Sequence, residues 1–482
     1  MTEPVLYWNN IALEANRRDH SGQMKAVHHG GPTRSARALA IAHIAMHDAC
    51  VRYYSNPSYQ PWLETVDLPD SATKAHEEVV MAISGAAYMA LKKMYPSHTD
   101  LFDANLLAMS TGIDESMANK EALAFGKSVG ERVFEKRKSD MNNPIPSLSD
   151  EIYNGNHKDD PFNSPQPLVG KDFGRTDHFV LKKRTALDVP PGYKQVQEPN
   201  LAYTLDTSAS TYSDYISHFR QVKEKGRRDN NERKIDEKLI GLYWAYDGVN
   251  EIGTPPRLYN QIAVEILSKK VTEIETTKRT VHLARWLMLI NVAMADAATE
   301  AWFHKFNYNV WRPVVGIREH GDELSSLARS RLNVDPDADP FWEPLGAPNS
   351  NSIGKDFTPP FPAYPSGHAT FGAAAFEMIR LIHGFKSGEM DNVGFDYVSD
   401  ELNGQSKDSS GTVRPRHNRR FDSMIEAMYW NGISRVYLGV HWRFDATTAE
   451  KPSELLNLEN QTGGIPLGRN IAADVFTNLG QI

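Results

Sequence analysis

Apolar residues at helical spacing dominate the chain. Residues 33–50 read TRSARALAIAHIAMHDAC, in which the larger apolar side chains recur close to the helical period and the alanines favour close packing of helices. The segments 76–95, 117–137 and 260–300 show the same pattern. No run of alternating apolar and polar residues is long enough to specify a major sheet. The pattern therefore predicts an all-α protein.

The helical pattern is interrupted in the middle of the chain. Residues from about 140 to 210 are rich in Pro, Asn, Asp and Gly, which predicts a long irregular excursion between two helical halves. Residues 222–237 are highly charged, and we interpret them as a solvated helix face. We expect a helical bundle over 1–140, an irregular connecting region over 141–235 and a second helical bundle over 236–482.

One internal similarity bears on these two halves. His43–Cys50 (HIAMHDAC) and Asn291–Ala298 (NVAMADAA) match at Ala, Met, Asp and Ala. Four identities in eight positions of Ala-rich sequence are equally compatible with coincidence and with duplication. A duplication would predict two related helical bundles that pack against each other.

Composition excludes several classes of protein. A chain of 482 residues with 40% hydrophobic and 24% charged residues is long enough for two or three folded domains. Its formal charge of 53 − 61 = −8 argues against a surface that neutralises nucleic-acid phosphates. The single cysteine, Cys50, excludes an intramolecular disulfide and any multi-cysteine metal site.

The sequence also gives no sign of membrane insertion or export. Its most apolar stretch, Trp286–Ala295, is about ten residues long, whereas a membrane-spanning helix needs ~20. The first ten residues, MTEPVLYWNN, lack the basic region and apolar core of a signal peptide. We expect a soluble protein. Its cellular compartment is not predicted, because a cytoplasmic enzyme and one exported by a non-classical route have the same sequence features.

The first candidate segment for chemistry is KFNYNVWRP, from Lys305 to Pro313. Lys305 and Arg312 are seven residues apart, about two helical turns, which predicts that both cations point to one side of a helix. Pro313 then ends the hydrogen-bond ladder. Taken alone, the ordinary interpretation is two solvated cations on a helix surface.

The second segment is PFPAYPSGHATFGAAAFEMIRL, residues 360–381. Ser366 is a predicted N-cap of the apolar helix that follows, and Gly367 allows a ligand to approach the main chain closely. The free N–H groups of such a helix start form an anion site, with His368 beside it. The alternative is a capped helix with an incidental histidine.

The third segment is SRVYLGVHWRFD, residues 434–445. Arg435 offers a planar fork of donors that suits a tetrahedral oxyanion, and Gly439 can bend the chain after it. The carboxylate of Asp445 lies four residues after His441, at a spacing that lets it orient the imidazole and raise its basicity. Alone, this pair is more often a core histidine satisfied by its neighbour.

Together the three segments point to one kind of site. They supply three cations, two neutral donors and two histidines, which are the parts of a cage for a multiply charged oxyanion with a nucleophile or ligand and a proton donor beside it. These residues are Lys305, Arg312, Ser366, Gly367, His368, Arg435 and His441.

The order of the motifs resembles a known signature. Lys-x6-Arg-Pro, then Pro-Ser-Gly-His, then Ser-Arg-x5-His-x3-Asp is similar to the pattern shared by vanadium-dependent haloperoxidases and type 2 phosphatidic-acid phosphatases. The stretches 243–262, 360–374, 433–446 and 463–468 resemble the haloperoxidase family in particular, so the resemblance covers about 240–482. It implies an all-α fold of two four-helix bundles packed together with long irregular connections.

The resemblance implies a vanadate cofactor, V(V), one per chain. His441 would bond vanadium axially through Nε2. The vanadate oxygens would be held by the side chains of Lys305, Arg312, Arg435 and Ser366 and by the amide of Gly367. His368 would be the acid–base residue beside the apical hydroxide.

The resemblance also assigns the surroundings of the cofactor. Asp247 would support an active-site arginine and, with Lys305 and His368, would count among the catalytic residues. Trp302 and Phe361 would line the halide pocket, and Asp445 would orient the axial histidine. Family bromoperoxidases often carry His where this chain has Phe361, which favours activity on chloride as well as bromide.

The implied reaction is oxidation of a halide ion by hydrogen peroxide to hypohalous acid, which halogenates small organic acceptors. No nucleic acid or membrane partner is expected, and a homo-oligomer is compatible with the sequence. The main alternative is a soluble acid phosphatase of the same superfamily, in which His441 attacks phosphorus. A non-catalytic oxyanion-binding helical protein is a third interpretation, although simple storage would not require two histidines and a supporting aspartate.

Overall fold

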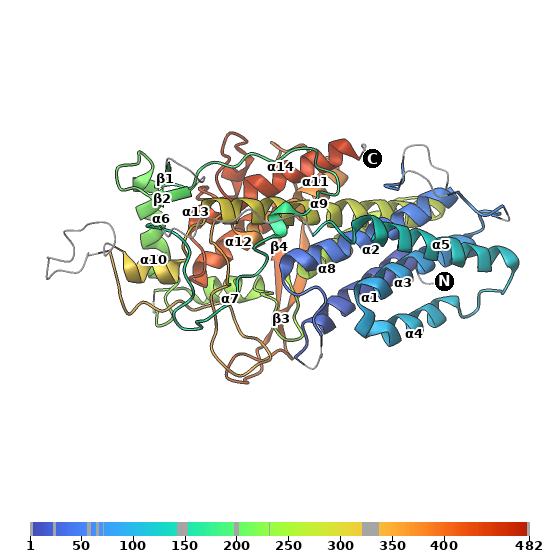
Figure 1. Cartoon of the computed structure of the whole chain (residues 1–482), viewed down its shortest axis with the longest axis horizontal. Helices are drawn as coiled ribbons and strands as arrows, with labels where there is room; N and C mark the ends of the chain where they lie inside the picture. The colour runs from blue at the N-terminus through green and yellow to red at the C-terminus, as the bar shows by residue number, and fades with distance from the viewer. Residues whose placement is uncertain are drawn as a thin grey trace.

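The computed structural model describes residues 3–22, 26–54, 59–63, 67–70, 72–141, 153–196, 202–230, 232–320 and 337–479. Over these residues the chain is mostly helical, with two small antiparallel sheets of two strands each (Figure 1). The predicted all-α class is therefore confirmed. Within the described ranges, no helix is long and apolar enough to cross a membrane.

In the described part of residues 1–141, five α-helices form the first half of the fold. They are α1 (Pro4–Asp19), α2 (Pro32–Tyr54), α3 (His76–Met94), α4 (Thr99–Ser110) and α5 (Met117–Arg137). Most residues of α2 are buried, and it packs against α3, α5 and the long helix α9 (Arg279–Tyr308) of the second half. In Figure 1, α1 to α5 lie together at the right, and α9 runs from this group into the C-terminal part.

The remaining elements follow the irregular middle of the chain. They are β1 (Tyr193–Val196), β2 (Ala202–Leu205), α6 (Tyr212–Lys225), α7 (Ile235–Tyr243), α8 (Pro255–Lys270), α10 (Pro313–Glu319), α11 (Gly367–Ile382), β3 (Phe395–Asn403), β4 (Arg416–Phe421), α12 (Met424–Tyr437), α13 (Arg443–Ala446) and α14 (Gly464–Asn478). Strand β1 pairs with β2, and β3 pairs with β4 through a register irregularity. The candidate site lies among α9, α11, α12 and the loops that join them.

The internal similarity between residues 43–50 and 291–298 has a structural counterpart. The two matching aspartates, Asp48 on α2 and Asp296 on α9, are both buried and both accept hydrogen bonds from main-chain amides of a neighbouring loop. Asp48 accepts from Trp62 N at 2.8 Å and Leu63 N at 2.7 Å. Asp296 accepts from the amides of 179–181 at 2.6, 3.0 and 3.0 Å. Equal roles at matched positions support duplication over coincidence.

Glycine pairs repeat the same packing in both halves. A side chain at Gly126 or Gly130 of α5 would meet main-chain atoms of α3, the nearest being carbonyl oxygens at 2.0 and 2.3 Å. A side chain at Gly464 of α14 would meet the carbonyl oxygen of Ser366, the N-cap of α11, at 2.6 Å, and one at Gly468 would meet Thr370 O of α11 at 2.3 Å. Because only glycine permits such close approach, α3 with α5 and α11 with α14 are equivalent helix pairs.

The irregular excursion is attached along α9. Four residues spaced four apart on one face of this helix bond to the main chain of 179–187, and they are Asp296, Glu300, His304 and Tyr308. The predicted excursion is thus confirmed for 153–192, while 142–152 and 197–201 lie outside the described residues. The predicted division at 140/141 and 235/236 stays a prediction.

One local expectation needs correction. The segment 222–237 is not one helix face, because α6 ends at Lys225 and α7 begins at Ile235. The helical pattern over 260–300 is present and is divided between α8 and α9.

Candidate active site

Lys305 is the first cation of the site, in the last turn of α9. Its side chain is fully buried, and Nζ donates to the carbonyl oxygens of Pro362 at 2.8 Å and Ala363 at 3.0 Å. An ammonium group has three protons, so two are used by the protein and one is left for a ligand. The segment before α11 therefore holds Lys305 toward the start of that helix.

Arg312 lies outside the helix that carries Lys305, contrary to the prediction that both cations share one helix face. Helix α9 ends at Tyr308 because Asn309 adopts the left-handed conformation, with φ 52°, and Arg312 is the N-cap of α10. Its guanidinium donates through Nε to Phe361 O and through Nη1 to Val440 O, each at 2.8 Å. Turning the chain at Asn309 brings the two cations together by a different route.

The start of α11 is the predicted helix N-terminus. Ser366 is the N-cap, and its hydroxyl accepts from Ala369 N at 3.4 Å, while its own amide donates to Asp445 O at 2.7 Å. A hydroxyl that accepts can still donate its proton. A side chain at Gly367 would lie 3.2 Å from the ring of Trp302, so this position is restricted to glycine or to a displaced indole.

His441 is held by Asp445, as the spacing predicts. Its Nδ1 lies 2.7 Å from Asp445 Oδ2, which also accepts from Trp442 N at 2.9 Å. A carboxylate only accepts, so Nδ1 carries the proton and Nε2 presents its lone pair. That lone pair accepts a hydrogen bond from Arg312 Nη1 at 2.8 Å. Gly439, with φ 71°, makes the predicted bend between Arg435 and His441.

Arg435 and Asp247 form a forked ion pair. Nη1 and Nη2 of the arginine donate to the two carboxylate oxygens at 3.1 and 2.6 Å, and both side chains are buried. Asp247 lies in the loop between α7 and α8, so this loop fixes the direction of the guanidinium. The prediction that Asp247 supports an active-site arginine agrees with this geometry.

His368 is the second residue of α11 and faces the same loop. Its Nε2 is hydrogen-bonded to the carbonyl oxygen of Ala245 and lies 4.0 Å from an oxygen of Asp247. Because a carbonyl only accepts, Nε2 carries the proton and Nδ1 the lone pair. Burial, with Arg435 nearby, holds the pKa of His368 well below its usual range, so the ring is neutral at neutral pH.

Positive charge is concentrated in this site. Burial, followed by repulsion from Arg312 and Arg435, holds the pKa of Lys305 well below its usual range, and burial lowers the pKa of Arg312 to about 9. Burial also raises the pKa of Asp445 to about 7, although the charges of Lys305 and Arg312 favour its ionised form. A multiply charged anion among these groups would relieve the repulsion.

A cavity of about 180 Å³ opens onto these groups. Asp247, His368, Arg435 and His441 line it together with the rings of Trp302, Phe361 and Phe371. The centroids of the Trp302 and Phe361 rings are 5.0 Å apart, and Lys305 Nζ lies 5.1 Å from the Phe361 centroid. The lining thus combines an apolar aromatic wall with polar side chains that include Arg435, whereas Lys305, Arg312 and Ser366 do not line the cavity.

The residues present fit a tetrahedral oxyanion such as vanadate. Two buried donors of the cage arginines, Arg312 Nη2 and Arg435 Nε, have no hydrogen-bond partner among the described residues. Over the described ranges, no group of three or more His, Cys, Asp or Glu side chains could hold a metal ion. The two unpaired guanidinium donors suit the oxygens of an anion, and His441 Nε2, which accepts from Arg312 here, would be the ligand of its central atom.

Sequence reasoning missed the main-chain groups and the N-terminal contribution to the site. The carbonyl of Ala245 and that of Val169, which accepts from Trp302 Nε1 at 3.0 Å, carry no signal in residue type. Gly31 and Pro32, at the start of α2, also line the cavity, although the first half of the chain carries none of the motifs. The sharp turn at Gly31, with φ 80°, is the one local signal.

Comparisons with known proteins agree with this geometry. The family model of the vanadium chloroperoxidase N-terminal domain matches residues 2–171, and that of the second helical-bundle domain of the same family matches residues 285–455. The vanadium chloroperoxidase of Curvularia inaequalis is 30% identical over an alignment of 553 residues that covers 100% of this chain and 84% of that protein.

Solved bacterial structures share the fold. A vanadium-dependent iodoperoxidase superposes with a TM-score of 0.65 at 18% identity over 99% of this chain and 97% of the other. The holo form of a vanadium-dependent chloroperoxidase gives a TM-score of 0.61 at 15% identity over 95% of each chain. On the sequence match over its whole length, the chain belongs to the vanadium chloroperoxidase family of haloperoxidases.

Proposed function

We propose that this protein is a vanadium-dependent haloperoxidase that uses hydrogen peroxide to oxidise bromide, and also chloride, to hypohalous acid. The observation that carries the proposal is the buried environment of His441, whose Nε2 accepts from Arg312 Nη1 at 2.8 Å and whose Nδ1 is fixed by Asp445. The charges of Arg312, Lys305 and Arg435 all help to hold the pKa of His441 well below its usual range, after burial itself. Family membership supports the reaction class. Small organic molecules would be the final acceptors of the halogen.

The residues assigned to vanadate are those that carry free donors in the cage. Lys305, Arg312 and Arg435 would hold its oxygens with the Ser366 hydroxyl and the Gly367 amide, and His441 Nε2 would bond the central atom. When bound, vanadate supplies a Lewis-acid centre that activates hydrogen peroxide without a change of metal oxidation state. One vanadate per chain follows from the single cage found among the described residues.

His368 is proposed as the acid–base residue. Its ring is neutral, its Nε2 proton is donated to Ala245 O, and its Nδ1 lone pair is available to accept a proton from hydrogen peroxide. Asp247 lies 4.0 Å away and stabilises the imidazolium that forms. The arrangement keeps the base neutral before the reaction and lowers the cost of charging it during the reaction.

Trp302 and Phe361 are proposed to form the wall against which the halide approaches. The Trp302 indole N–H is committed to Val169 O, so the ring offers an apolar surface and no donor to the cavity. A weakly solvated halide in this pocket is exposed to the field of Lys305 and Arg312 without competing hydrogen bonds.

The decisive experiment measures halide-dependent consumption of hydrogen peroxide by purified protein, with and without added orthovanadate. We expect bromination of a phenolic dye that requires bromide, peroxide and vanadate together. A phosphate monoester assay on the vanadate-free protein runs in parallel. Phosphatase turnover without any vanadate-dependent halogenation would overturn the proposal in favour of an acid phosphatase, and neither activity would favour an oxyanion-binding protein.

A further inference from the structure

The loop between α7 and α8 reaches the site at two points. Ala245 presents its carbonyl oxygen to His368 Nε2, and Asp247 holds the guanidinium of Arg435 by two hydrogen bonds. The two groups are separated by a single residue, Tyr246. Whatever fixes Tyr246 therefore fixes the partners of the acid–base histidine and of one cage arginine at the same time.

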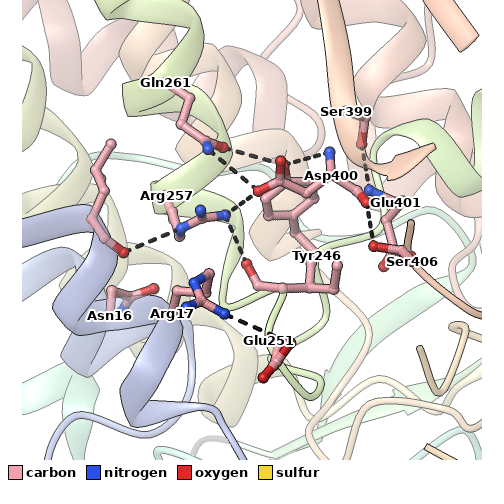
Figure 2. Close-up of polar contacts among 12 residues, drawn as sticks. Asn16, Arg17, Tyr246, Glu251, Arg257, Gln261, Ser399, Asp400, Glu401 and Ser406 are labelled. Carbon is pink, nitrogen blue, oxygen red and sulfur yellow. Dashed lines mark hydrogen bonds and ion pairs between the residues drawn. The ribbon is translucent and has the colours of Figure 1, made fainter. Parts of the chain in front are cut away.

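Tyr246 has a backbone conformation that needs support. Its φ is 42°, in the left-handed region that a bulky residue rarely adopts without compensating contacts. The side chain is fully buried and does not line the cavity. Its hydroxyl donates to Gln261 Oε1 at 3.2 Å and accepts from Asp400 N at 2.9 Å, as Figure 2 shows.

The far end of the loop is tied to the same strand. Arg257, in the first turn of α8, donates to Ile252 O at 3.0 Å and to Leu13 O of α1 at 3.2 Å, and it forms an ion pair with Asp400 on β3 (Figure 2). The carboxylate of Asp400 also accepts from Gln261 Nε2 at 3.3 Å. Strand β3 thus anchors the loop at Tyr246, and β3 and helix α1 together hold its C-terminal end through Arg257.

We infer that Tyr246, held by Asp400 and Gln261 and backed by the Arg257–Asp400 pair, is a positioning residue that sets the direction of His368 and Arg435 toward the oxyanion. The inference rests on the proposed function for its catalytic consequence, but its effect on the cage can be measured by anion binding alone. Tyr246, Arg257, Gln261 and Asp400 do not line the cavity, so they act through Ala245 and Asp247.

The test uses two tyrosines of matched chemistry on either side of Ala245. Tyr243 is also fully buried, and its hydroxyl donates to the main chain of the same strand, at Tyr397 O and 3.2 Å. Tyr246→Phe and Tyr243→Phe each remove one buried phenol hydroxyl that bonds to β3. Only Tyr246 lies between the two site contacts, so Tyr243→Phe is the control for loss of stability.

The full-length variants are titrated with orthovanadate in equilibrium dialysis, and bromide turnover is then measured at saturating vanadate. We expect both variants to lower the thermal midpoint similarly, while Tyr246→Phe alone weakens vanadate binding about tenfold and lowers kcat about tenfold, within the range for disturbed supporting groups of a metal site. Wild-type binding and kcat in Tyr246→Phe, or equal losses in both variants, would overturn the inference.

A second variant covers the case in which Tyr246→Phe does not fold. Gln261 is partly exposed, so Gln261→Met removes the acceptor of the Tyr246 hydroxyl with little change in volume. The same loss of vanadate affinity is expected, and unchanged affinity would contradict the inference. If the wild type binds vanadate but oxidises no halide, the proposed function fails, whereas the affinities still decide whether Tyr246 positions the cage.

Discussion

The carboxylate of Asp445 is held both by a main-chain amide and by the ring of His441. It accepts the amide proton of Trp442 at 2.9 Å and the Nδ1 proton of His441 at 2.7 Å, and both side chains are buried. The imidazole is therefore held in one tautomer and one orientation, with Nε2 toward the cage. A ligand preset in this way loses little freedom when it bonds a metal centre.

Asp445→Asn is the direct test of this relationship. The amide is neutral and can turn its NH2 group toward the ring, so it neither fixes the tautomer nor raises the basicity of Nε2. We expect vanadate affinity to fall about 10- to 100-fold, as is typical when such a partner of a metal ligand is changed. Equilibrium dialysis with vanadium analysis measures the affinity, and an unchanged value would contradict the assigned ligand.

Removing each histidine in turn separates ligation from proton transfer. His441→Ala should abolish halogenation while the cations retain weak affinity for the oxyanion. His368→Ala should keep vanadate bound but lose most turnover, because general acid–base help is worth about 10²–10⁴-fold. Vanadate binding and bromide turnover are measured on both proteins, and full halogenation by His441→Ala would show that the ligand assignment is wrong.

The aromatic wall predicts activity on chloride as well as bromide. Phe361 lies against Lys305 and Arg312 and offers no competing hydrogen bond, so the positive field acts on a poorly solvated chloride. Turnover of each halide is compared between pH 4 and 7, with Phe361→His as the variant expected to lose chloride activity preferentially. Bromide turnover without chloride turnover at any acidic pH would refute this prediction.

The motif residues of the cage could be predicted from sequence, because each needs a particular side-chain chemistry at a fixed spacing. Ser366 as an N-cap and Asp445 four residues after His441 are local patterns, and both contacts are present. The path from Lys305 to Arg312 could not be predicted correctly. A single left-handed residue, Asn309, ends the helix, and asparagine adopts that conformation only in some contexts.

The parts of the site made by main-chain atoms could not be predicted from residue types. Ala245 contributes a carbonyl whose position depends on Tyr246 and on a strand about 150 residues later in the chain. The sequence alone does not distinguish duplication of the two halves from coincidence, since alanine-rich helices match each other easily. The matched contacts of Asp48 and Asp296 to loop amides distinguish it from coincidence.

The duplicated halves suggest a variant that tests acid stability. His43 on α2 matches Asn291 on α9, and each side chain contacts the carbonyl four residues earlier, at 2.7 and 2.8 Å. Burial lowers the pKa of His43 from 6.5 to about 4. Between these values the unfolded chain binds a proton that the folded chain does not, so His43 stabilises the fold fully above pH 6.5 and this contribution is lost as the pH falls toward 4.

His43→Asn should remove this pH dependence while keeping a polar group that the other half uses. We expect the free energy of unfolding of the wild type to fall relative to the variant by up to about 3 kcal/mol between pH 7.5 and 4.5, at ~1.36 kcal/mol per pKa unit. Urea unfolding at several pH values gives both curves. Other buried histidines affect both proteins equally, so parallel curves would contradict the assigned role of His43.

The cage should also recognise phosphate, because charge and tetrahedral shape are the features that its donors read. Excess orthophosphate should compete with vanadate during reconstitution, and the vanadate-free protein should slowly hydrolyse an activated phosphate ester, with His441 as nucleophile and His368 as acid. Arg435→Ala removes a buried cation whose Nε is unpaired and could serve either anion, so both effects should vanish together. Arg414→Ala is the matched control, since it removes a buried arginine paired with Glu401 that does not line the cavity.

Reconstitution of peroxidase activity is followed at rising phosphate concentration. If a large phosphate excess leaves reconstitution unchanged, the oxyanion is not held by this set of donors, and the assignment of the cage is wrong.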